Sequence, residues 1–333
     1  MQLILNTFGA SLRKEGQMFL VLSGDTKHKI AAGKVESILI STGVHISTDA
    51  VELALKNNIE IFLLDKYGNP IGRFWHVRMG STARIRRAQL MLSESENGLQ
   101  FGLRWVRAKF ENQIEFLKAL RSRRTRLSAE LTAATESIAD NLEKLNNITG
   151  AIEEIRGRVL GIEGSAGKVY WDVFAKLVPG QFAFNGRSKR PAKDAFNAIL
   201  NYGYGVLYGL TEKAVILAGL DPYIGFVHTD HYNKVSLVFD VIEKYRIWAE
   251  QCILQLFSKK ALKKNFFETT RAGMYLGDEG KKVFLPAFNQ FLDEQVRYKK
   301  RNVRRRDVIQ LELHAFAQEL LKTTKDTMER KFK

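Results

Sequence analysis

The period of the hydrophobic residues changes near residue 76, and this change limits the folds open to the chain. Before it, short runs rich in Val, Ile, Leu and Phe are separated by turn sequences such as Ser23-Gly24-Asp25, which is typical of strands. From Arg84 to Leu145 there is no proline, strong helix formers dominate, and the period is 3.6. We therefore predict an α+β protein with a small β-rich domain at residues 1–76 and a larger all-α domain at residues 77–333.

The first domain is expected to be a scaffold or an oligomerisation surface. Its one helical pattern, STDAVELALKNN at residues 47–58, places Val51 and Leu55 on one face, and Asn57-Asn58 can end it. No cluster of catalytic residue types occurs in this part of the chain. Chemistry is therefore expected in the second domain.

The charge of the chain is strongly positive and unevenly distributed. The formal net charge is +16 and the pI is near 9.8. Residues 1–75 hold eight Lys/Arg and seven Asp/Glu, so nearly all the excess lies in the second domain. A polyanionic partner, nucleic acid first, is expected to bind there.

Cysteine usage and hydropathy exclude several classes of protein. The single cysteine, Cys252, allows neither an internal disulfide nor a cysteine-based zinc cluster, and a reducing cytoplasm is the expected compartment. No apolar run approaches the ~18 residues of a membrane span. Arg13, Lys14 and Glu15 interrupt the region where a signal peptide would be apolar. We expect no membrane association.

The stretch from Tyr223 to Phe257 carries the first candidate site. It is expected to be a short extended segment ending at His228, a polar turn, and one long amphipathic helix. Asp240 and Glu243 would lie roughly 60° apart on that helix, opposite its apolar stripe. A histidine before two paired acids is a plausible half of a metal site, and a solvated acidic face is the alternative. Ile247 on the same face favours a covered cleft.

A second carboxylate, Glu163, lies in a predicted helix among Gly161, Gly164 and Gly167. Because a glycine inside a helix costs on the order of 1 kcal/mol relative to alanine, three of them suggest close approach of a backbone or a ligand. In the alternative interpretation the glycines break the helix and Glu163 is a surface acid. A local metal pair of His228 and His231, with Asp230 between them, is also open.

Two basic segments are candidate nucleic-acid contacts, although each could equally be a solvated face. One is the loop PGQFAFNGRSKRPAKD at residues 179–194. The other is the run Arg297–Arg306, in which seven of ten residues are Lys or Arg. The residues predicted to contact nucleic acid are Arg187, Lys189, Arg190, Lys299, Lys300, Arg301, Arg304 and Arg305.

Four sequence blocks occur in an order that resembles one known family. They are GIEGSAGKVYW, RPAKDAFNAILNYGYGVL, GFVH and SLVFDVIE, and STGVHIST and IEIFLLDKYG in the first domain are similar as well. Together they resemble the CRISPR-associated integrase, the first-numbered Cas protein of the adaptation module. The departures are Gly167 where alanine or arginine is commoner, the polar turn HTDHYNK, and Glu243 where some relatives have aspartate.

The resemblance implies a dimerising β domain and a helical domain that holds one divalent ion, Mg²⁺ or Mn²⁺. Glu163, His228 and Glu243 would be the metal ligands, with Asp240 as a further catalytic acid beside them. The implied activity is metal-dependent DNA strand transfer, in which the 3′-hydroxyl of a short foreign duplex attacks a phosphodiester at the edge of a CRISPR repeat. Implied partners are double-stranded and branched DNA, a second copy of the chain in a homodimer, and the second-numbered small Cas protein in a hetero-oligomer.

Two other functions remain open at this point. One is a metal-dependent nuclease that acts on branched DNA and has no role in integration. The other is a basic DNA-binding scaffold without enzymatic activity, whose acids are solvated.

Overall fold

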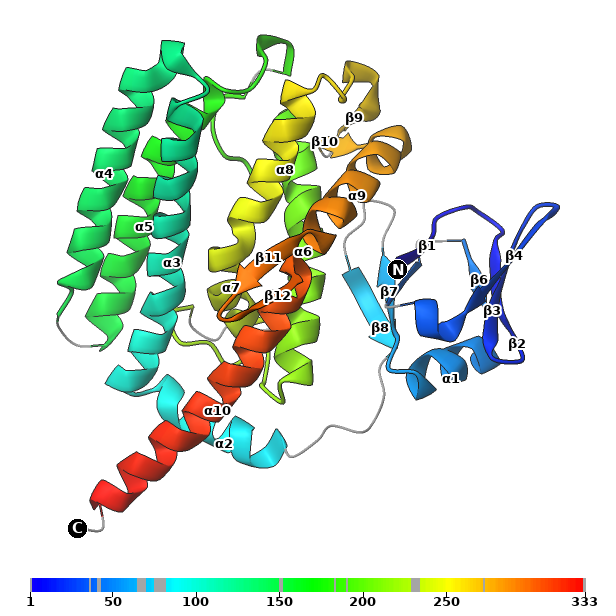
Figure 1. The fold of residues 1–333 in the computed structure, drawn as a ribbon, viewed down its shortest axis with the longest axis horizontal. Helices are drawn as coiled ribbons and strands as arrows, with labels where there is room; N and C mark the ends of the chain where they lie inside the picture. Colours follow the sequence, from blue (N-terminus) through cyan, green and yellow to red (C-terminus); the bar gives the residue numbers. More distant parts are fainter. Residues whose placement is uncertain are drawn as a thin grey trace. The chain divides into compact units, whose positions relative to one another are not determined.

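The computed structural model describes residues 2–35, 37–40, 43–64, 70–74, 82–149, 152–182, 184–189, 191–228, 234–271 and 273–331. The chain divides into two compact units, Met1–Gly80 and Ser81–Lys333 (Figure 1). The first is rich in strands and the second is mostly helical, so the predicted α+β class is confirmed.

The first unit contains two four-stranded sheets and one α-helix. One sheet has the strand order β1-β5-β7-β8, in which only the β7–β8 pair is antiparallel, and the other has the order β4-β3-β2-β6. The elements are β1 (Gln2–Leu5), β2 (Ser11–Glu15), β3 (Met18–Ser23), β4 (Thr26–Ala31), η1 (Ala32–Lys34), β5 (Ser37–Ile40), β6 (His45–Ile46), α1 (Thr48–Lys56), β7 (Glu60–Leu64) and β8 (Pro70–Phe74).

The core of this unit lies between the two sheets and α1, which packs on β2 and β7. Leu12, Ile38 and Ile61 come from three strands of these sheets and are fully buried. The helix begins where the hydroxyl of Ser47 accepts a hydrogen bond from the Ala50 N–H, as an N-cap should.

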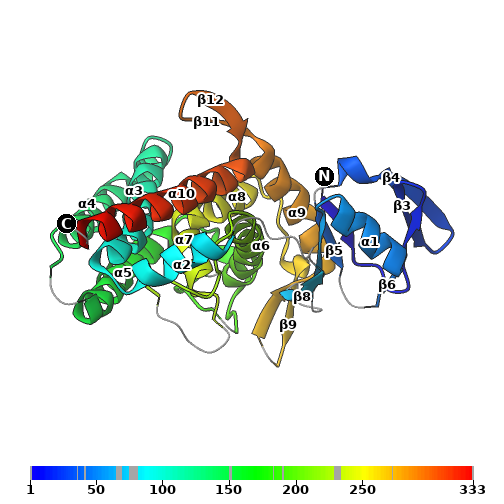
Figure 2. The ribbon, with the colours of Figure 1, turned by 90° about the horizontal axis from the view of Figure 1, so that it is seen from below.

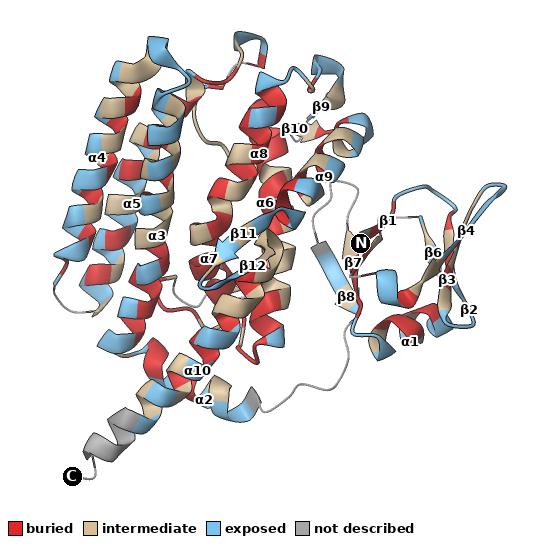
Figure 3. Cartoon of the chain, viewed as in Figure 1, coloured by how far each residue is buried: buried red, intermediate tan, exposed pale blue. Residues whose placement is uncertain are grey.

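The second unit is built on long helices. They are α2 (Thr82–Ser93), α3 (Glu96–Arg121), α4 (Ser128–Asn146), α5 (Ile152–Ala175), α6 (Ala195–Leu217), α7 (Ser236–Ile242), α8 (Arg246–Ser258), α9 (Asp278–Asp293) and α10 (Arg305–Lys331), with short 3₁₀ turns η2 (Thr125–Leu127), η3 (Gly180–Phe182), η4 (Glu243–Tyr245) and η5 (Lys264–Phe266). Buried residues concentrate on α6 and α8 (Figure 3). Asp194 caps α6 by accepting a hydrogen bond from the Asn197 N–H at 2.7 Å, as its position in the sequence predicts.

The expectation of an all-α second domain is wrong in one respect. Two antiparallel hairpins interrupt the helices: β9 (Phe267–Thr270) with β10 (Gly273–Leu276), and β11 (Gln295–Tyr298) with β12 (Arg301–Arg304). The second hairpin turns at Lys299, which has a positive φ of 53°, and it projects from the junction of α9 and α10 (Figure 2). Because most residues of this run are basic, the alternation of apolar and polar residues that would predict two short strands is not visible in the sequence.

The long helix expected after His228 is also not continuous. It consists of α7, the 3₁₀ turn η4 and α8, so Glu243 sits at the change of helical geometry. A 3₁₀ turn inside a helix often marks a functional position. Before it, residues 223–228 form turns and bends rather than a strand, because the N–H groups of residues 226–228 bind a side chain instead of a neighbouring strand.

Candidate active site

Glu163 lies in the middle of an unbroken helix, α5. The helix continues through Gly161, Gly164 and Gly167, so the alternative in which these glycines mark a break is wrong. No atom of the described residues lies within 4 Å of where a Cβ would stand on any of the three, so packing inside the chain does not require them. The Glu163 side chain is 11% exposed and is not a surface acid.

The ammonium group of Lys109 stands between Glu163 and Glu243. Lys109 belongs to α3. The Nζ of this lysine lies 2.9 Å from Oε1 of Glu163 and 2.7 Å from Oε2 of Glu243. Burial disfavours the charged lysine, but the two carboxylates outweigh burial and raise the pKa of the Lys109 ammonium. Two acids that are distant in the sequence thus converge on one cation.

Glu243 is 4% exposed and pairs with a second cation. Nη2 of Arg246, one helical turn later, lies 2.8 Å from Oε1 of Glu243. Burial alone would raise the pKa of Glu243, yet Arg246 and Lys109 lower it to about 2. The carboxylate is therefore ionised at neutral pH although it is buried. The alternative in which these acids form a solvated face is therefore wrong. The non-enzymatic scaffold was based on solvated acids, so its premise is wrong as well.

Asp240 has different partners from Glu243, although the two are only three residues apart. Its carboxylate accepts hydrogen bonds from the N–H groups of Phe226 (2.6 Å), Val227 (3.1 Å) and His228 (2.9 Å). Its Oδ1 also lies 2.7 Å from Nδ1 of His228. Asp240 therefore holds both the backbone and the ring of His228, and it leaves Nε2 of the imidazole to face elsewhere.

Two further features fit this arrangement of the histidine segment. A Cβ at Gly225 would lie 2.4 Å from the carbonyl oxygen of His228, so only glycine allows the chain to fold back this tightly. Burial would lower the pKa of the His228 imidazole, but Asp240, and then Glu243 and Glu163, outweigh burial and raise it. Asp240, three residues before Glu243, thus ties His228 to the segment that carries the second acid.

The donor set has the chemistry of a site for a divalent ion. Two carboxylates and an imidazole are ligands that Mg²⁺ and Mn²⁺ accept, and the two carboxylates already share one cation. Across the described ranges, no three His, Cys, Asp or Glu side chains are placed so that they could hold an ion together. The Lys109 ammonium takes the position between the carboxylates instead.

Arg187 and Arg246 share one aromatic ring. Their guanidinium groups lie 5.4 Å and 4.9 Å from the ring centre of Tyr204, and Arg246 in turn pairs with Glu243. The Arg187 guanidinium donates hydrogen bonds to the side-chain oxygens of Asn197 (2.7 Å) and Asn201 (2.6 Å), which are neutral partners, and burial lowers its pKa. Partial burial and the charge of Arg246 lower the pKa of the Lys189 ammonium in the same loop.

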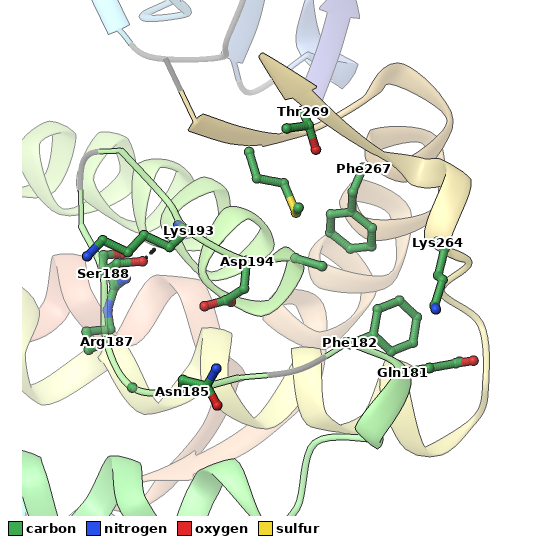
Figure 4. A pocket seen from close by; sticks show the side chains of 13 residues that line it. Gln181, Phe182, Asn185, Arg187, Ser188, Lys193, Asp194, Lys264, Phe267 and Thr269 are labelled. Atoms are coloured by element: carbon green, nitrogen blue, oxygen red, sulfur yellow. Dashed lines mark hydrogen bonds between the residues drawn. The ribbon is translucent and has the colours of Figure 1, made fainter. Parts of the chain in front are cut away.

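The same loop borders a pocket of about 640 Å³ (Figure 4). Arg187, Ser188 and Lys193 line one side, and Lys264 and Phe267 line the side near β9. Amide, hydroxyl and cationic groups thus face a concave surface.

The basic run at residues 297–306 has two parts with different surroundings. Lys299, Lys300 and Arg301 are exposed at the turn of the β11–β12 hairpin. Arg304 pairs with Asp307 at 2.8 Å, and Arg305 pairs with Glu294 at 2.9 Å while its guanidinium stacks 3.6 Å from the ring centre of Phe291. Both arginines therefore have carboxylate partners in or next to α9 and α10, and their predicted nucleic-acid contact stays a prediction.

Sequence reasoning missed the central role of Lys109 and of Arg246. In the sequence Lys109 forms a basic cluster with Arg104 and Arg107, but it lies three residues after Val106 and four before Gln113, both of which are buried. A lysine on the buried stripe of a helix is the signal that identifies it. Arg246 follows Glu243 at the i+3 spacing of helical ion pairs.

Several predictions concern residues outside the described ranges. Arg190, Asp230 and His231 belong to these, so the nucleic-acid contact of Arg190 and the His228–His231 metal pair stay predictions.

Cys252 is buried in α8, and burial raises the pKa of its thiol to about 12. Among the helices described, none is long and apolar enough to cross a membrane.

Known proteins resemble the chain over nearly its whole length. The profile of the family described as CRISPR associated protein Cas1 matches residues 3–290. The chain is 34% identical over 324 residues to CRISPR-associated endonuclease Cas1 1 of Archaeoglobus fulgidus, and the alignment covers 93% of this chain and 94% of that protein.

Solved structures share the fold. A casposase bound to its integration product superposes with a TM-score of 0.83 at 24% identity, covering 97% of this chain and 91% of the casposase. A Cas6-RT-Cas1–Cas2 complex contains a chain with a TM-score of 0.77 at 20% identity, covering 98% of this chain and 35% of that one.

Proposed function

The chain belongs to the Cas1 family of CRISPR-associated proteins, and on that premise we propose that it is a divalent-metal-dependent DNA integrase and endonuclease. In the proposed reaction, the 3′-hydroxyl of a short foreign duplex attacks a phosphodiester at the edge of a CRISPR repeat. The duplex is thereby inserted as a spacer. The relative from Archaeoglobus fulgidus is called an endonuclease, and the similar casposase was solved with an integration product.

One observation carries the proposal. The largely buried carboxylates of Glu163 and Glu243, from two different segments of the helical unit, converge on the Lys109 ammonium, and Asp240, three residues before Glu243, holds the imidazole of His228. Burying two acids in one place is costly unless a cation compensates them, so their convergence favours a cation-binding task. Mg²⁺ or Mn²⁺ is the proposed cofactor, with Glu163, His228 and Glu243 as its ligands.

A bound divalent ion would supply Lewis-acid stabilisation of the charge that develops on the transferring phosphoryl group. Asp240 fixes the orientation of the His228 ring through the contact of its Oδ1 with Nδ1. With three N–H groups and Nδ1 already bound to its carboxylate, Asp240 serves as a positioning residue rather than a proton acceptor.

The cations around the acid pair suit a substrate rich in phosphate. Arg246 pairs with Glu243, Arg187 lies over the same Tyr204 ring as Arg246, Lys189 follows in the loop of Arg187, and the pocket lined by that loop adds further polar groups. We propose that they bind DNA phosphates near the reacting bond, and that Lys299, Lys300 and Arg301 bind duplex phosphates at the projecting hairpin. The proposed assembly is a homodimer that binds the second-numbered Cas protein, as suggested by the Cas1–Cas2 composition of a complex with a similar chain.

A strand-transfer assay tests the function. The protein, its Cas2 partner and Mn²⁺ are incubated with a labelled duplex bearing 3′-hydroxyl ends and a supercoiled plasmid that contains a CRISPR repeat. Joining of the label to the repeat edge is expected, and the same duplex with 3′-dideoxy ends is the control. If branched DNA is cut under these conditions while no label is ever joined, the protein is a branched-DNA nuclease and integration is wrong.

A further inference from the structure

We propose that Glu250, together with Tyr170 and Tyr204, is a positioning device that fixes the separation between Glu163 and Glu243. The inference rests on the proposed function, since its purpose is to hold the two carboxylates at the spacing that a divalent ion requires. Glu250 touches neither carboxylate. It acts through the helices that carry them.

The contact joins three helices in the core of the second unit. Oε2 of Glu250 on α8 accepts a hydrogen bond from the Tyr170 hydroxyl of α5 at 2.6 Å, and Oε1 accepts one from the Tyr204 hydroxyl of α6 at 2.6 Å. The three residues are buried, with exposures of 1%, 0% and 4% for Glu250, Tyr170 and Tyr204. Short hydrogen bonds to a buried carboxylate are directional. The two tyrosine–Glu250 bonds therefore set both the distance between the helices and the rotation of each helix about its axis.

The positions of Tyr170 and Glu250 along their helices connect this contact to the acid pair. Tyr170 follows Glu163 by two helical turns on α5, and Glu250 follows Glu243 by the same number of residues through η4 and α8. On α5 these seven residues rise roughly 10 Å and return to the same face. The segment from Glu243 to Glu250 begins with the 3₁₀ turn η4 and continues in α8, and it meets α5 at both ends: Lys109 bridges Glu163 and Glu243, and Tyr170 binds Glu250. A shift at one of these two contacts is transmitted to the other, because hydrogen-bonded helical turns connect them in both segments.

Stability alone does not explain why a glutamate occupies position 250. Burial raises the pKa of Glu250, the tyrosine hydrogen bonds oppose that rise only in part, and apolar residues of similar volume would fill the same space without the desolvation cost. The nearest cations, Lys109 and Arg246, pair with Glu163 and Glu243. What the acid adds is a fixed geometry between α5, α6 and α8.

The test measures metal binding directly. Mn²⁺ titrations followed by electron paramagnetic resonance compare the full-length wild type with Tyr170→Phe, Tyr204→Phe, Glu250→Ala and Glu250→Gln. Tyr170→Phe and Glu250→Ala are expected to weaken Mn²⁺ affinity about tenfold or more, as removal of groups that orient ligands does. Glu250→Gln is expected to stay near wild type, because the amide can accept from one tyrosine and donate to the other.

Tyr202→Phe is the matched control, because Tyr202 lies on α6 next to Tyr204 but packs on Phe284 instead of bonding Glu250. Circular dichroism and thermal melting confirm that each variant is folded. Equal Mn²⁺ affinity in the wild type, Tyr170→Phe and Glu250→Ala would overturn the inference, as would a loss in Glu250→Gln as large as in Glu250→Ala. Absence of Mn²⁺ binding in the wild type would instead overturn the proposed function.

Discussion

Nζ of Lys109 and Oε2 of Glu243 lie 2.7 Å apart inside the helical unit, and the same ammonium reaches Glu163. A lysine of α3 thereby supplies part of the charge that compensates the two acids of the candidate metal site. Any cation that binds between these carboxylates has to replace this contact. The relationship makes the stability of the protein and its affinity for a divalent ion interdependent.

Replacing Lys109 by methionine should therefore destabilise the protein without added metal and make it depend on metal. Leaving two buried carboxylates without this ammonium costs on the order of 3 kcal/mol. Added Mn²⁺ should raise the melting temperature of Lys109→Met more than that of the wild type. Lys118→Met, an exposed change on the same helix, is the control, and an equal Mn²⁺ effect in wild type and Lys109→Met would contradict the role of the ammonium.

Glu163→Gln and Glu243→Gln should each abolish strand transfer while leaving DNA binding intact. Loss of a direct ligand is expected to reduce the rate by about a hundredfold or more, since even residues that only orient ligands contribute 10- to 100-fold. Rates on the repeat plasmid and affinities from fluorescence anisotropy are measured on the same preparations. Glu111→Gln, an exposed acid of α3, should behave as wild type. Full activity in both active-site variants would rule out the proposed site.

The pKa of Glu243 predicts how stability changes in acid. Its pKa is about 2 in the folded protein and near 4.5 in the unfolded chain, so its contribution is fully present above pH 4.5 and is lost as the pH falls toward 2. The contribution is on the order of a few kcal/mol. Urea unfolding between pH 6 and pH 3 should show a shallower loss of stability for Glu243→Gln than for the wild type. Parallel curves would show that the pKa is not depressed.

The His228 imidazole should titrate above its ordinary value of 6.5, because Asp240, Glu243 and Glu163 outweigh burial. With a raised pKa, its stabilising contribution is present below pH 6.5 and disappears as the pH rises through the folded pKa. Nuclear magnetic resonance titration of the imidazole in metal-free protein measures the value. Asp240→Asn should lower the pKa of the His228 imidazole. An unchanged pKa in this variant would show that Asp240 does not influence the histidine.

The two parts of the 297–306 run should respond differently to mutation. Lys299→Ala combined with Lys300→Ala should weaken duplex binding and reduce the slope of log K against log salt by about 2, with no change in melting temperature. Arg305→Ala should instead lower the melting temperature, because it removes the pair with Glu294 and the stacking on Phe291. Anisotropy at several salt concentrations and thermal melting distinguish these outcomes. A salt slope unchanged in the double variant would refute DNA contact at the hairpin.

Local pattern was sufficient for the class of fold and for half of the candidate site. The change of period near residue 76 separates the strand-rich unit from the helical one, because alternation and helical spacing depend only on neighbouring residues. Asp194 as the cap of α6 and the burial of that helix follow from the same local rules. Local pattern also groups His228, Asp240 and Glu243, whereas only the resemblance of four sequence blocks to a known family adds Glu163 to them.

Only the tertiary structure decided what each of these residues does. Asp240 and Glu243 are three residues apart, yet one binds the N–H groups of residues 226–228 and the other pairs with Lys109 from a different helix. A helical period specifies which face a side chain occupies, but its partner depends on which distant helix packs there. For the same reason Lys109 resembles a surface lysine in the sequence and is a buried counter-ion in the fold, while the fold gives Arg304 and Arg305 carboxylate partners that the sequence does not reveal.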